Sequence, residues 1–156
     1  MLVLFIKSYL LGSIPFAYIF AWSWKKEDIR KLGSENVGTT NVIKQIGFIP
    51  GAMTALFDAG KGMIAVALGD SISVCGEFVA LIAAMVGHNW PFWLGFHGGG
   101  GLATFIGGML LLSKWWIILI LLGIWGLAYI ILKSHDRSAL TACCISPFII
   151  GILHSS

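Results

Sequence analysis

The sequence predicts an all-α fold, a polytopic integral membrane bundle with about six transmembrane or partly spanning helices. Apolar residues make up 58% of the 156 residues, charged residues make up only 11%, and the mean hydropathy is +0.90. A soluble domain of this length could not bury so much apolar surface. No internal repeat or low-complexity tract divides the chain. We therefore expect residues 1–156 to form a single membrane-embedded domain.

The individual helices follow from the lengths of the apolar runs, because a helix needs about 20 apolar residues to cross a bilayer. Four runs approach this length: Leu2–Trp22, Ile49–Leu68, Trp115–Leu132 and Ala139–Leu153. Ser73–Val86 and Leu102–Leu112 are shorter, so they are expected to be tilted partners of neighbouring helices or helices that end partway through the membrane. The first run is too long for a cleaved signal peptide and lacks a basic start, so we expect it to be retained.

Basic residues predict the orientation of the bundle, because cytoplasmic loops are enriched in Lys and Arg. Two connections on one side hold most of them: Lys25, Lys26, Arg30, Lys31, Lys44, Lys133 and Arg137. The opposing connections hold Lys114 alone. We therefore expect both termini to lie outside. The net charge of +3 reflects this loop bias, so no nucleic-acid partner is expected.

The sequence carries no signature of metal chemistry or of the common nucleophilic enzymes. Cys75, Cys143 and Cys144 show no metal-ligand spacing with the histidines. The chain also lacks a Gly-x-Ser-x-Gly elbow, a Walker lysine followed by Ser or Thr, and a His-x-x-x-x-Asp pair. We expect no metal ion and no cofactor.

The first basic connection contains a segment rich in small polar residues, which we call the hydroxyl-rich loop, Ser34–Lys44. It combines hydroxyl, amide and glycine positions with a lysine: Ser34, Asn36, Gly38, Thr39, Thr40, Asn41 and Lys44. Backbone N–H groups, hydroxyls, amides and a cation are the groups that hold a phosphate dianion. The alternative is that these residues only cap a helix and form turns, which is a common use of such residues.

A glycine-rich loop, Gly95–Gly101, precedes the apolar run at Leu102, and we call it the glycine connection. Pro91 ends the preceding helix, and four consecutive glycines, Gly98–Gly101, lead directly into the apolar run at Leu102. Backbone N–H groups at the start of a helix favour an anion, so we interpret the bare backbone as an approach path for a phosphate. The alternative is close helix packing through small residues. Two such loops on one face favour a phosphate ester as the ligand.

Four segments, taken in order, resemble a known family. They are "YLLGSIPFAYIF" (Tyr9–Phe20), "GSENVGTTNV" (Gly33–Val42), "FDAGKG" (Phe57–Gly62) and "GHNWPFWLGFHGGGGLAT" (Gly87–Thr104). They look like the bacterial integral-membrane acyl-phosphate:glycerol-3-phosphate acyltransferases of the PlsY type. The resemblance implies a multi-pass enzyme of the bacterial plasma membrane with its active face in the cytoplasm. It implies transfer of a fatty acyl group from acyl phosphate to the 1-hydroxyl of glycerol 3-phosphate, giving lysophosphatidic acid for phospholipid biosynthesis.

The resemblance also implies which residues bind the substrates, while no catalytic residue is assigned. The family motif Ser-Gly-Asn-x-Gly-Ala-Thr-Asn is matched here except that Glu35 replaces glycine and Thr39 replaces alanine, and Lys44 replaces a later arginine. The motif Phe-Lys-Gly-Gly-Lys-Gly has lost both lysines, at His97 and Gly100. The substrate-binding residues implied are Ser34, Asn36, Gly38, Thr40, Asn41, Lys44, His97, Gly98, Gly99, Gly100 and Gly101.

Two other functions stay open because the lost lysines lie where developing charge needs a cation. One is a catalytically degenerate relative that binds a phosphate ester or membrane lipid without turnover, alone or paired with an intact paralogue. The other is a small transporter, since interrupted helices whose ends face an anion also occur in transporters. His97, Lys44 and Lys61 are the candidates to replace the lost charge.

The apolar run Ile49–Leu68 also contains two ionisable residues. Asp58 and Lys61 are three residues apart, so they share one face of a helix. We expect a structural ion pair directed into the bundle. Glu77 and His88 lie near the ends of their segment and are expected to be solvated.

Overall fold

Every regular element in the computed structural model is a helix, within the residues that it describes: 1–72, 74–112, 115–133, 141 and 145. The predicted all-helical class is therefore confirmed. The chain divides into two compact units, residues 1–112 and 113–156, and each is treated by itself. The expectation of a single domain over the whole chain stays a prediction.

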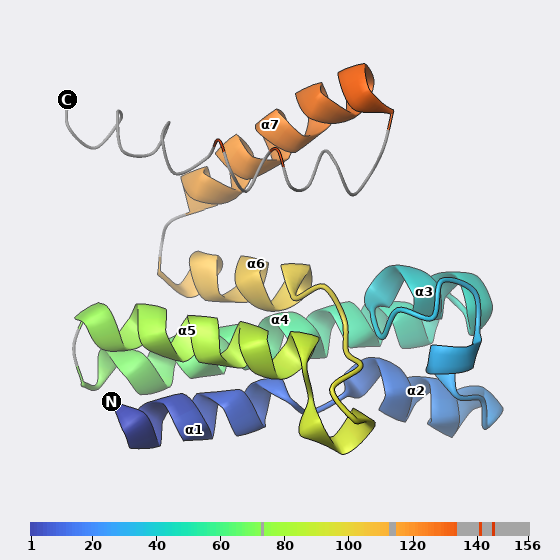
Figure 1. The fold of residues 1–156 in the computed structure, drawn as a ribbon, viewed down its shortest axis with the longest axis horizontal. Coiled ribbons are helices and arrows are strands. Elements are labelled where there is room, and N and C mark those ends of the chain that lie inside the picture. Colours follow the sequence, from blue (N-terminus) through green and yellow to red (C-terminus); the bar gives the residue numbers. More distant parts are fainter. Residues whose placement is uncertain (73, 113–114, 134–140, 142–144, 146–156) are drawn as a thin grey trace. The chain divides into compact units, whose positions relative to one another are not determined.

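The first unit carries the polar loops (Figure 1). Its longer helices are α1 (Leu2–Gly12), α2 (Phe16–Lys25), α3 (Thr39–Gln45), α4 (Phe48–Asp70), α5 (Val74–Asn89) and α6 (Leu102–Leu111). Two short 3-10 turns lie in the loops, η1 (Ile29–Lys31) and η2 (Phe92–Leu94). In the second unit the helix α7 (Trp115–Leu132) has the predicted bounds. The predicted run Ala139–Leu153 lies outside the described residues apart from isolated positions.

The first predicted span is one apolar stretch but two helices. Ser13 ends α1, and Pro15 precedes α2 with φ −91° and ψ 73°, outside the helical region. Proline has no N–H group to continue the helical hydrogen bonds. The interruption exposes the Ile14 carbonyl, which accepts hydrogen bonds from the Phe16 N–H (3.1 Å) and from Lys61 Nζ (3.1 Å).

The helices differ in how much of a bilayer they can cross. Residues 2–25, taken across the interruption, and α4 are long and apolar enough to span a membrane. The two shorter predicted runs are confirmed as helices, α5 and α6. With ten residues, α6 covers about 15 Å, roughly half of a hydrocarbon core. In Figure 1, α6 begins about level with the middle of α4.

The first unit exposes many large apolar side chains and buries several polar ones beside its apolar core. Buried side chains include several polar and charged ones: Ser8, Ser13, Asn41, Thr54, Asp58, Lys61, His88 and Thr104. Large apolar side chains such as Phe48, Leu56 and Ile64 are exposed. Apolar surface on this scale needs a lipid environment or a partner to cover it. This agrees with the predicted membrane bundle.

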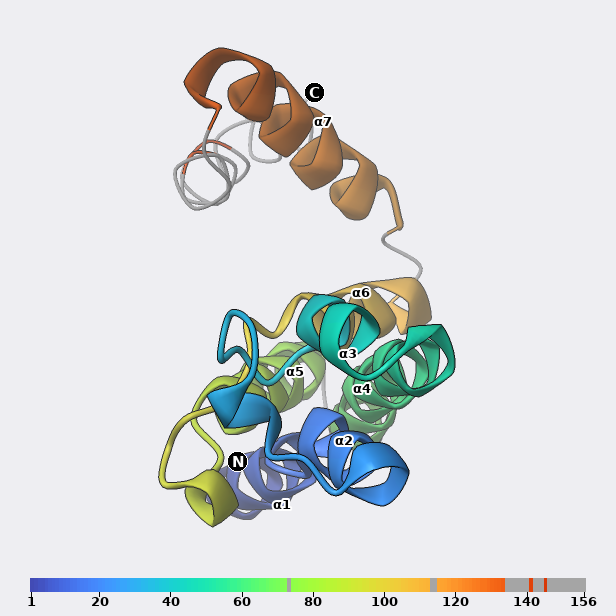
Figure 2. The same ribbon diagram turned by 90° about the vertical axis from the view of Figure 1, so that its right-hand side faces the viewer.

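Small residues bring the helices into close contact. A Cβ atom on Gly12 would overlap the backbone of Ala84 in α5, and one on Gly107 would overlap the backbone of Ala59 in α4. Such close approach is the usual way in which membrane helices associate. Figure 2, a view from the end that carries α2 and α3, shows α1, α4, α5 and α6 lying side by side.

The contact between α4 and α6 can be tested with a matched pair of glycines. A Cβ on Gly62 would overlap the Thr104 carbonyl group, whereas a Cβ on Gly60 would meet no atom within 4 Å. We expect Gly62→Ala to lower the free energy of unfolding by about 1–3 kcal/mol, because the helices must move apart. Gly60→Ala should leave it unchanged or slightly higher, since alanine favours helices. Thermal unfolding in detergent checks this, and equal midpoints would contradict it.

Candidate functional site

The hydroxyl-rich loop and the glycine connection meet at one place in the first unit. The Val37 N–H donates to the Gly98 carbonyl at 3.5 Å, and Gly99 lies against the Val37 carbonyl. Arg30 Nη1 also reaches the Leu94 carbonyl at 3.5 Å. Both loops therefore lie on the same side of the bundle, as expected.

Asn41 fixes the shape of the hydroxyl-rich loop. Its Oδ1 accepts a hydrogen bond from the Ser34 N–H at 3.2 Å. Its Nδ2 lies within hydrogen-bond range of the carbonyls of Ile29, Leu32 and Asn36, at 3.3, 2.9 and 3.0 Å. Two N–H bonds serve three acceptors, so the amide has no donor left for a ligand. The structure thus gives Asn41 a structural role, and its predicted contact with substrate stays a prediction.

The other predicted residues of this loop keep their polar groups available. Ser34, Asn36, Thr40 and Lys44 are exposed, and among the described residues their side chains make no hydrogen bond or ion pair. Gly38 is the N-cap of α3, so the first N–H groups of this helix lack helical partners. Hydroxyl and amide side chains therefore lie in sequence around the unpaired backbone donors at the start of α3, while the ammonium group of Lys44 belongs to the last turn of this helix.

The glycines of the glycine connection do two different things. The N–H groups of Gly98 and Gly99 donate to the carbonyls of Asn89 and His88, both at 3.1 Å. A Cβ on either glycine would overlap the segment His88–Pro91. These two glycines are therefore needed for packing, and their N–H groups are not free for a phosphate. For this pair the structure shows a packing role, and the predicted contact with substrate stays a prediction.

Gly100 and Gly101 fit the original interpretation better. Within the described part of the chain, their N–H groups make no intramolecular hydrogen bond. A Cβ on Gly100 would meet nothing within 4 Å, and Gly101, with φ +72°, is the N-cap of α6. The first N–H groups of α6 extend this set of free donors. His97 is exposed beside them, and its Nδ1 donates to the Gly95 carbonyl at 2.7 Å.

The loops carry fixed positive charge as well. Arg30 pairs with Asp28 at 2.8 Å and lies over the ring of Tyr18, 5.3 Å from its centroid. The hydrogen bonds from Arg30 hold the pKa of the Asp28 carboxyl group below its ordinary value, against the opposing effect of burial. Lys25 Nζ donates to the Gln45 carbonyl at 2.9 Å and so closes the end of α3. Lys44 lies in the last turn of that helix.

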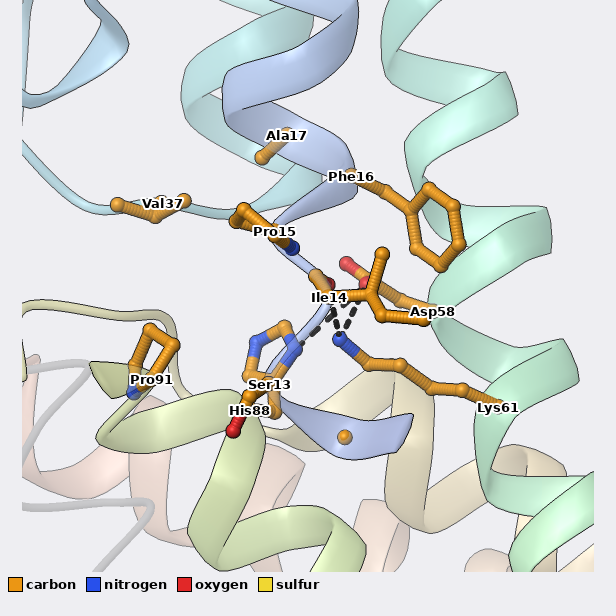
Figure 3. A pocket seen from close by; sticks show the side chains of 11 residues that line it. Ser13, Ile14, Pro15, Phe16, Ala17, Val37, Asp58, Lys61, His88 and Pro91 are labelled. Atoms are coloured by element: carbon orange, nitrogen blue, oxygen red, sulfur yellow. Dashed lines mark hydrogen bonds and ion pairs between the residues drawn. The ribbon is translucent and has the colours of Figure 1, made fainter. Parts of the chain in front are cut away.

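A buried cluster lies directly beneath the junction of the two loops (Figure 3). Lys61 Nζ is 2.9 Å from Asp58 Oδ1, which confirms the predicted ion pair. His88 Nδ1 is 3.6 Å from the same oxygen. The three side chains line a small cavity with Ile14, Pro15, Phe16 and Val37.

The expectation that His88 is solvated is wrong. The residue is only 8% exposed, because α5 ends one residue later and the chain folds back over its ring. Glu77, in the first turn of α5, is partly exposed as expected. The signal for His88 is its place in "GHNWP", where the following proline ends the helix and returns the chain.

Comparison with known proteins identifies the family. A family model described as glycerol-3-phosphate acyltransferase matches residues 2–155 of the chain. The chain belongs to the glycerol-3-phosphate acyltransferase family. The resemblance stated from the four sequence segments is thereby confirmed.

Individual relatives in this family have the same name. A glycerol-3-phosphate acyltransferase from Desulforamulus reducens is 37% identical over 99% of this chain and 78% of the relative. One from Jannaschia sp. is 40% identical over 90% of this chain and 69% of the relative. One from Halalkalibacterium halodurans is 48% identical over 67% of this chain and 53% of the relative.

Two solved structures of the acyltransferase PlsY (YgiH), an integral membrane protein, share the fold. Its glycerol 3-phosphate form superposes with a TM-score of 0.79 at 30% identity, over 97% of this chain and 76% of that one. Its lysophosphatidic acid form gives 0.67 at 29% identity, over 96% and 85%. The membrane character of the fold is therefore shared with a solved protein.

The departures from the family motifs have distinct structural settings. Glu35 has φ +60°, so it occupies a left-handed position where the family motif has glycine, which adopts this conformation without strain. Gly100, where the motif has its second lysine, is exposed and has open space around it. The loop therefore keeps room for the side chain that it has lost.

Asn41→Ala tests the structural role of the buried amide. We expect faster amide hydrogen exchange across residues 29–41, because the carbonyls of Ile29, Leu32 and Asn36 lose their donor. The free energy of unfolding should fall by about 1–3 kcal/mol. Asn36→Ala is the matched control, since its exposed side chain holds no part of the loop. Hydrogen exchange followed by mass spectrometry measures both, and identical exchange would contradict the role.

Proposed function

We propose that this chain transfers a fatty acyl group from acyl phosphate to the 1-hydroxyl of glycerol 3-phosphate and forms lysophosphatidic acid. The observation that carries the proposal is the junction of two donor-rich loops in a member of this family. Membership of the family indicates the class of reaction. The junction of the hydroxyl-rich loop and the glycine connection supplies a site that can bind a phosphate. The bound forms of PlsY, with glycerol 3-phosphate and with lysophosphatidic acid, support the acceptor and the product.

The unpaired donors match the chemistry of a phosphate ester. The hydroxyls of Ser34 and Thr40, the amide of Asn36 and the N–H groups of Gly100 and Gly101 come from both sides of the junction. Each can donate to a phosphate oxygen, and a dianion offers several acceptors at once. The ammonium group of Lys44 and the imidazole of His97 then balance the charge in place of the lost lysines.

The reaction needs the two substrates to be positioned more than it needs an acid catalyst, because acyl phosphate is an activated mixed anhydride with a good leaving group. The 1-hydroxyl oxygen attacks the acyl carbonyl carbon, and the bond from that carbon to the phosphate oxygen breaks. The departing phosphate has basic oxygens that take up the hydroxyl proton, so atoms and charge balance without a cofactor. The protein then has to bring two anions together and hold the attacking oxygen near the carbonyl.

The apolar chain of the donor has a matching surface next to the buried cluster. A groove of about 290 Å³ is lined mainly by apolar side chains of α1, α2 and α4, among them Leu11, Phe16, Phe57 and Ile64. Lys61 lies at its inner end and also lines the small cavity beneath the loops. We assign this groove to the acyl chain, which leaves the acyl phosphate head near the junction.

The active face is assigned to the cytoplasm and the membrane to the bacterial plasma membrane. The support is the concentration of basic residues in the connection between α2 and α4, on the same side as the glycine connection. Soluble glycerol 3-phosphate would then reach the junction from the cytoplasm, while the acyl chain stays in lipid.

The function is tested directly with purified protein, acyl phosphate and labelled glycerol 3-phosphate. We expect lysophosphatidic acid to form, and Ser34→Ala to lower kcat/KM by about 10- to 100-fold through loss of an anion donor. Ser23→Ala, another exposed serine outside the loop, is the matched control. Binding of glycerol 3-phosphate without product would indicate the degenerate relative. Flux across liposomes without acyl transfer would indicate a transporter.

Gly100→Lys restores a charge that the family motif carries at this position. The surrounding space admits the side chain, and φ lies outside the left-handed range. We expect kcat/KM to rise about 10-fold or more, because a cation again faces the departing phosphate. Gly100→Met supplies similar length without charge and should not raise it. A steady-state comparison of the two variants decides, and an equal effect of both would exclude a role for charge.

A further inference from the structure

The buried carboxylate of Asp58 has hydrogen-bonding capacity that Lys61 does not fill. The two side chains are each 2% exposed, and Nζ lies 2.9 Å from Oδ1. Even so, Oδ1 accepts no well-aligned hydrogen bond from the described residues. The Lys61 ammonium group also donates to the Ile14 carbonyl at the interruption between α1 and α2. A buried carboxylate oxygen in this state favours a second donor.

His88 presents that second donor. Its Nδ1 faces Asp58 Oδ1 at 3.6 Å, about 0.5 Å longer than a hydrogen bond (Figure 3). The ring is buried, so water does not compete freely for the carboxylate. In the neutral ring, an N–H group on Nδ1 would point at this oxygen, so the geometry favours the tautomer with hydrogen on Nδ1.

The opposite edge of the same ring supports the junction of the two loops. Nε2 lies against Gly99, so closely that a Cβ there would overlap the ring and the Val37 carbonyl. The backbone carbonyl of His88 also accepts the Gly99 N–H at 3.1 Å. His88 thus lies between a buried charge on one side and both loops on the other.

We propose that Asp58 is a positioning residue of the acyl-transfer site, which acts by fixing the ring of His88 beneath Gly99 and Val37. The inference rests on the proposed function. Asp58 itself lies below the junction and touches no loop donor. Its carboxylate sets the orientation of the ring, and the ring sets how closely the glycine connection approaches the hydroxyl-rich loop. The free N–H groups of Gly100 and Gly101 follow directly along the chain.

The test replaces the ion pair as a unit, because removal of one charge would leave the other buried and unpaired. Asp58→Leu with Lys61→Met keeps the core apolar and filled, a change that is often neutral for stability. Asp58→Asn with Lys61→Met also removes both charges but keeps an oxygen facing His88 Nδ1. Ser8→Ala is the control, since this buried hydroxyl has no partner among the described residues and lies outside the cluster.

The kinetic readout is the KM for glycerol 3-phosphate, measured separately from kcat. We expect the leucine double variant to raise this KM about tenfold with a smaller change in kcat, because the loops lose their relative position before chemistry begins. The asparagine double variant should recover most of the loss, and the control should match the unmodified chain. A purely structural role of Asp58 predicts equal effects of the two double variants.

A second readout is independent of acyl transfer. In protein labelled with 15N-histidine, the nitrogen shifts of His88, assigned through His88→Gln, should show a proton on Nδ1. The leucine double variant should move that proton to Nε2. If the unmodified chain forms no product, the proposed function fails, while this measurement still decides the placement of the ring.

If the leucine double variant does not fold, a further variant still tests the proposal. His88→Gln removes the ring itself, so it should raise the KM as much as loss of Asp58 does. Combining it with the asparagine double variant should then add nothing further, since both act through one ring. Additive effects, or an unchanged KM together with an unchanged Nδ1 proton in the leucine double variant, would overturn the positioning role.

Discussion

Inside hydrocarbon, a backbone N–H or C=O group that leaves a helix has no water to replace its lost partner. In the first unit, both the break between α1 and α2 and the connection between α5 and α6 are supplied with hydrogen-bond partners from elsewhere in the chain. Lys61 donates to the Ile14 carbonyl at the first. The carbonyls of His88 and Asn89 accept the N–H groups of Gly99 and Gly98 at the second. Both segments line the cavity that also holds Asp58, Lys61 and His88. The need to pair backbone groups that leave a helix therefore brings the parts of the site together.

The positions of the helices could be predicted from the sequence because hydropathy acts over long runs of residues. The bounds of α7 and the short helix α6 follow from it closely. The interruption at Pro15 could not be placed, since Leu2–Trp22 is predominantly apolar and a single proline also occurs in kinked continuous helices.

The site itself was predicted only at the level of its segments. Residue types pointed to the hydroxyl-rich loop and to the glycine connection, but the use of each residue depends on tertiary contacts that spacing does not reveal. Asn41 looks like a ligand donor in the sequence and holds its own loop in the structure. Gly98 and Gly99 look like phosphate donors and pack against His88–Pro91 instead. His88 was missed as a buried residue because its burial depends on the chain that returns over it.

The short length of α6, about half of the thickness of a hydrocarbon core, has a consequence for acyl transfer. Because α6 is only about 15 Å long and begins level with the middle of α4, its first N–H groups lie away from both ends of that longer helix. Under the proposed function, an acyl phosphate held at these groups would be screened from bulk water, which would otherwise hydrolyse it to free fatty acid. The shortness of α6 would then protect a labile donor until glycerol 3-phosphate arrives.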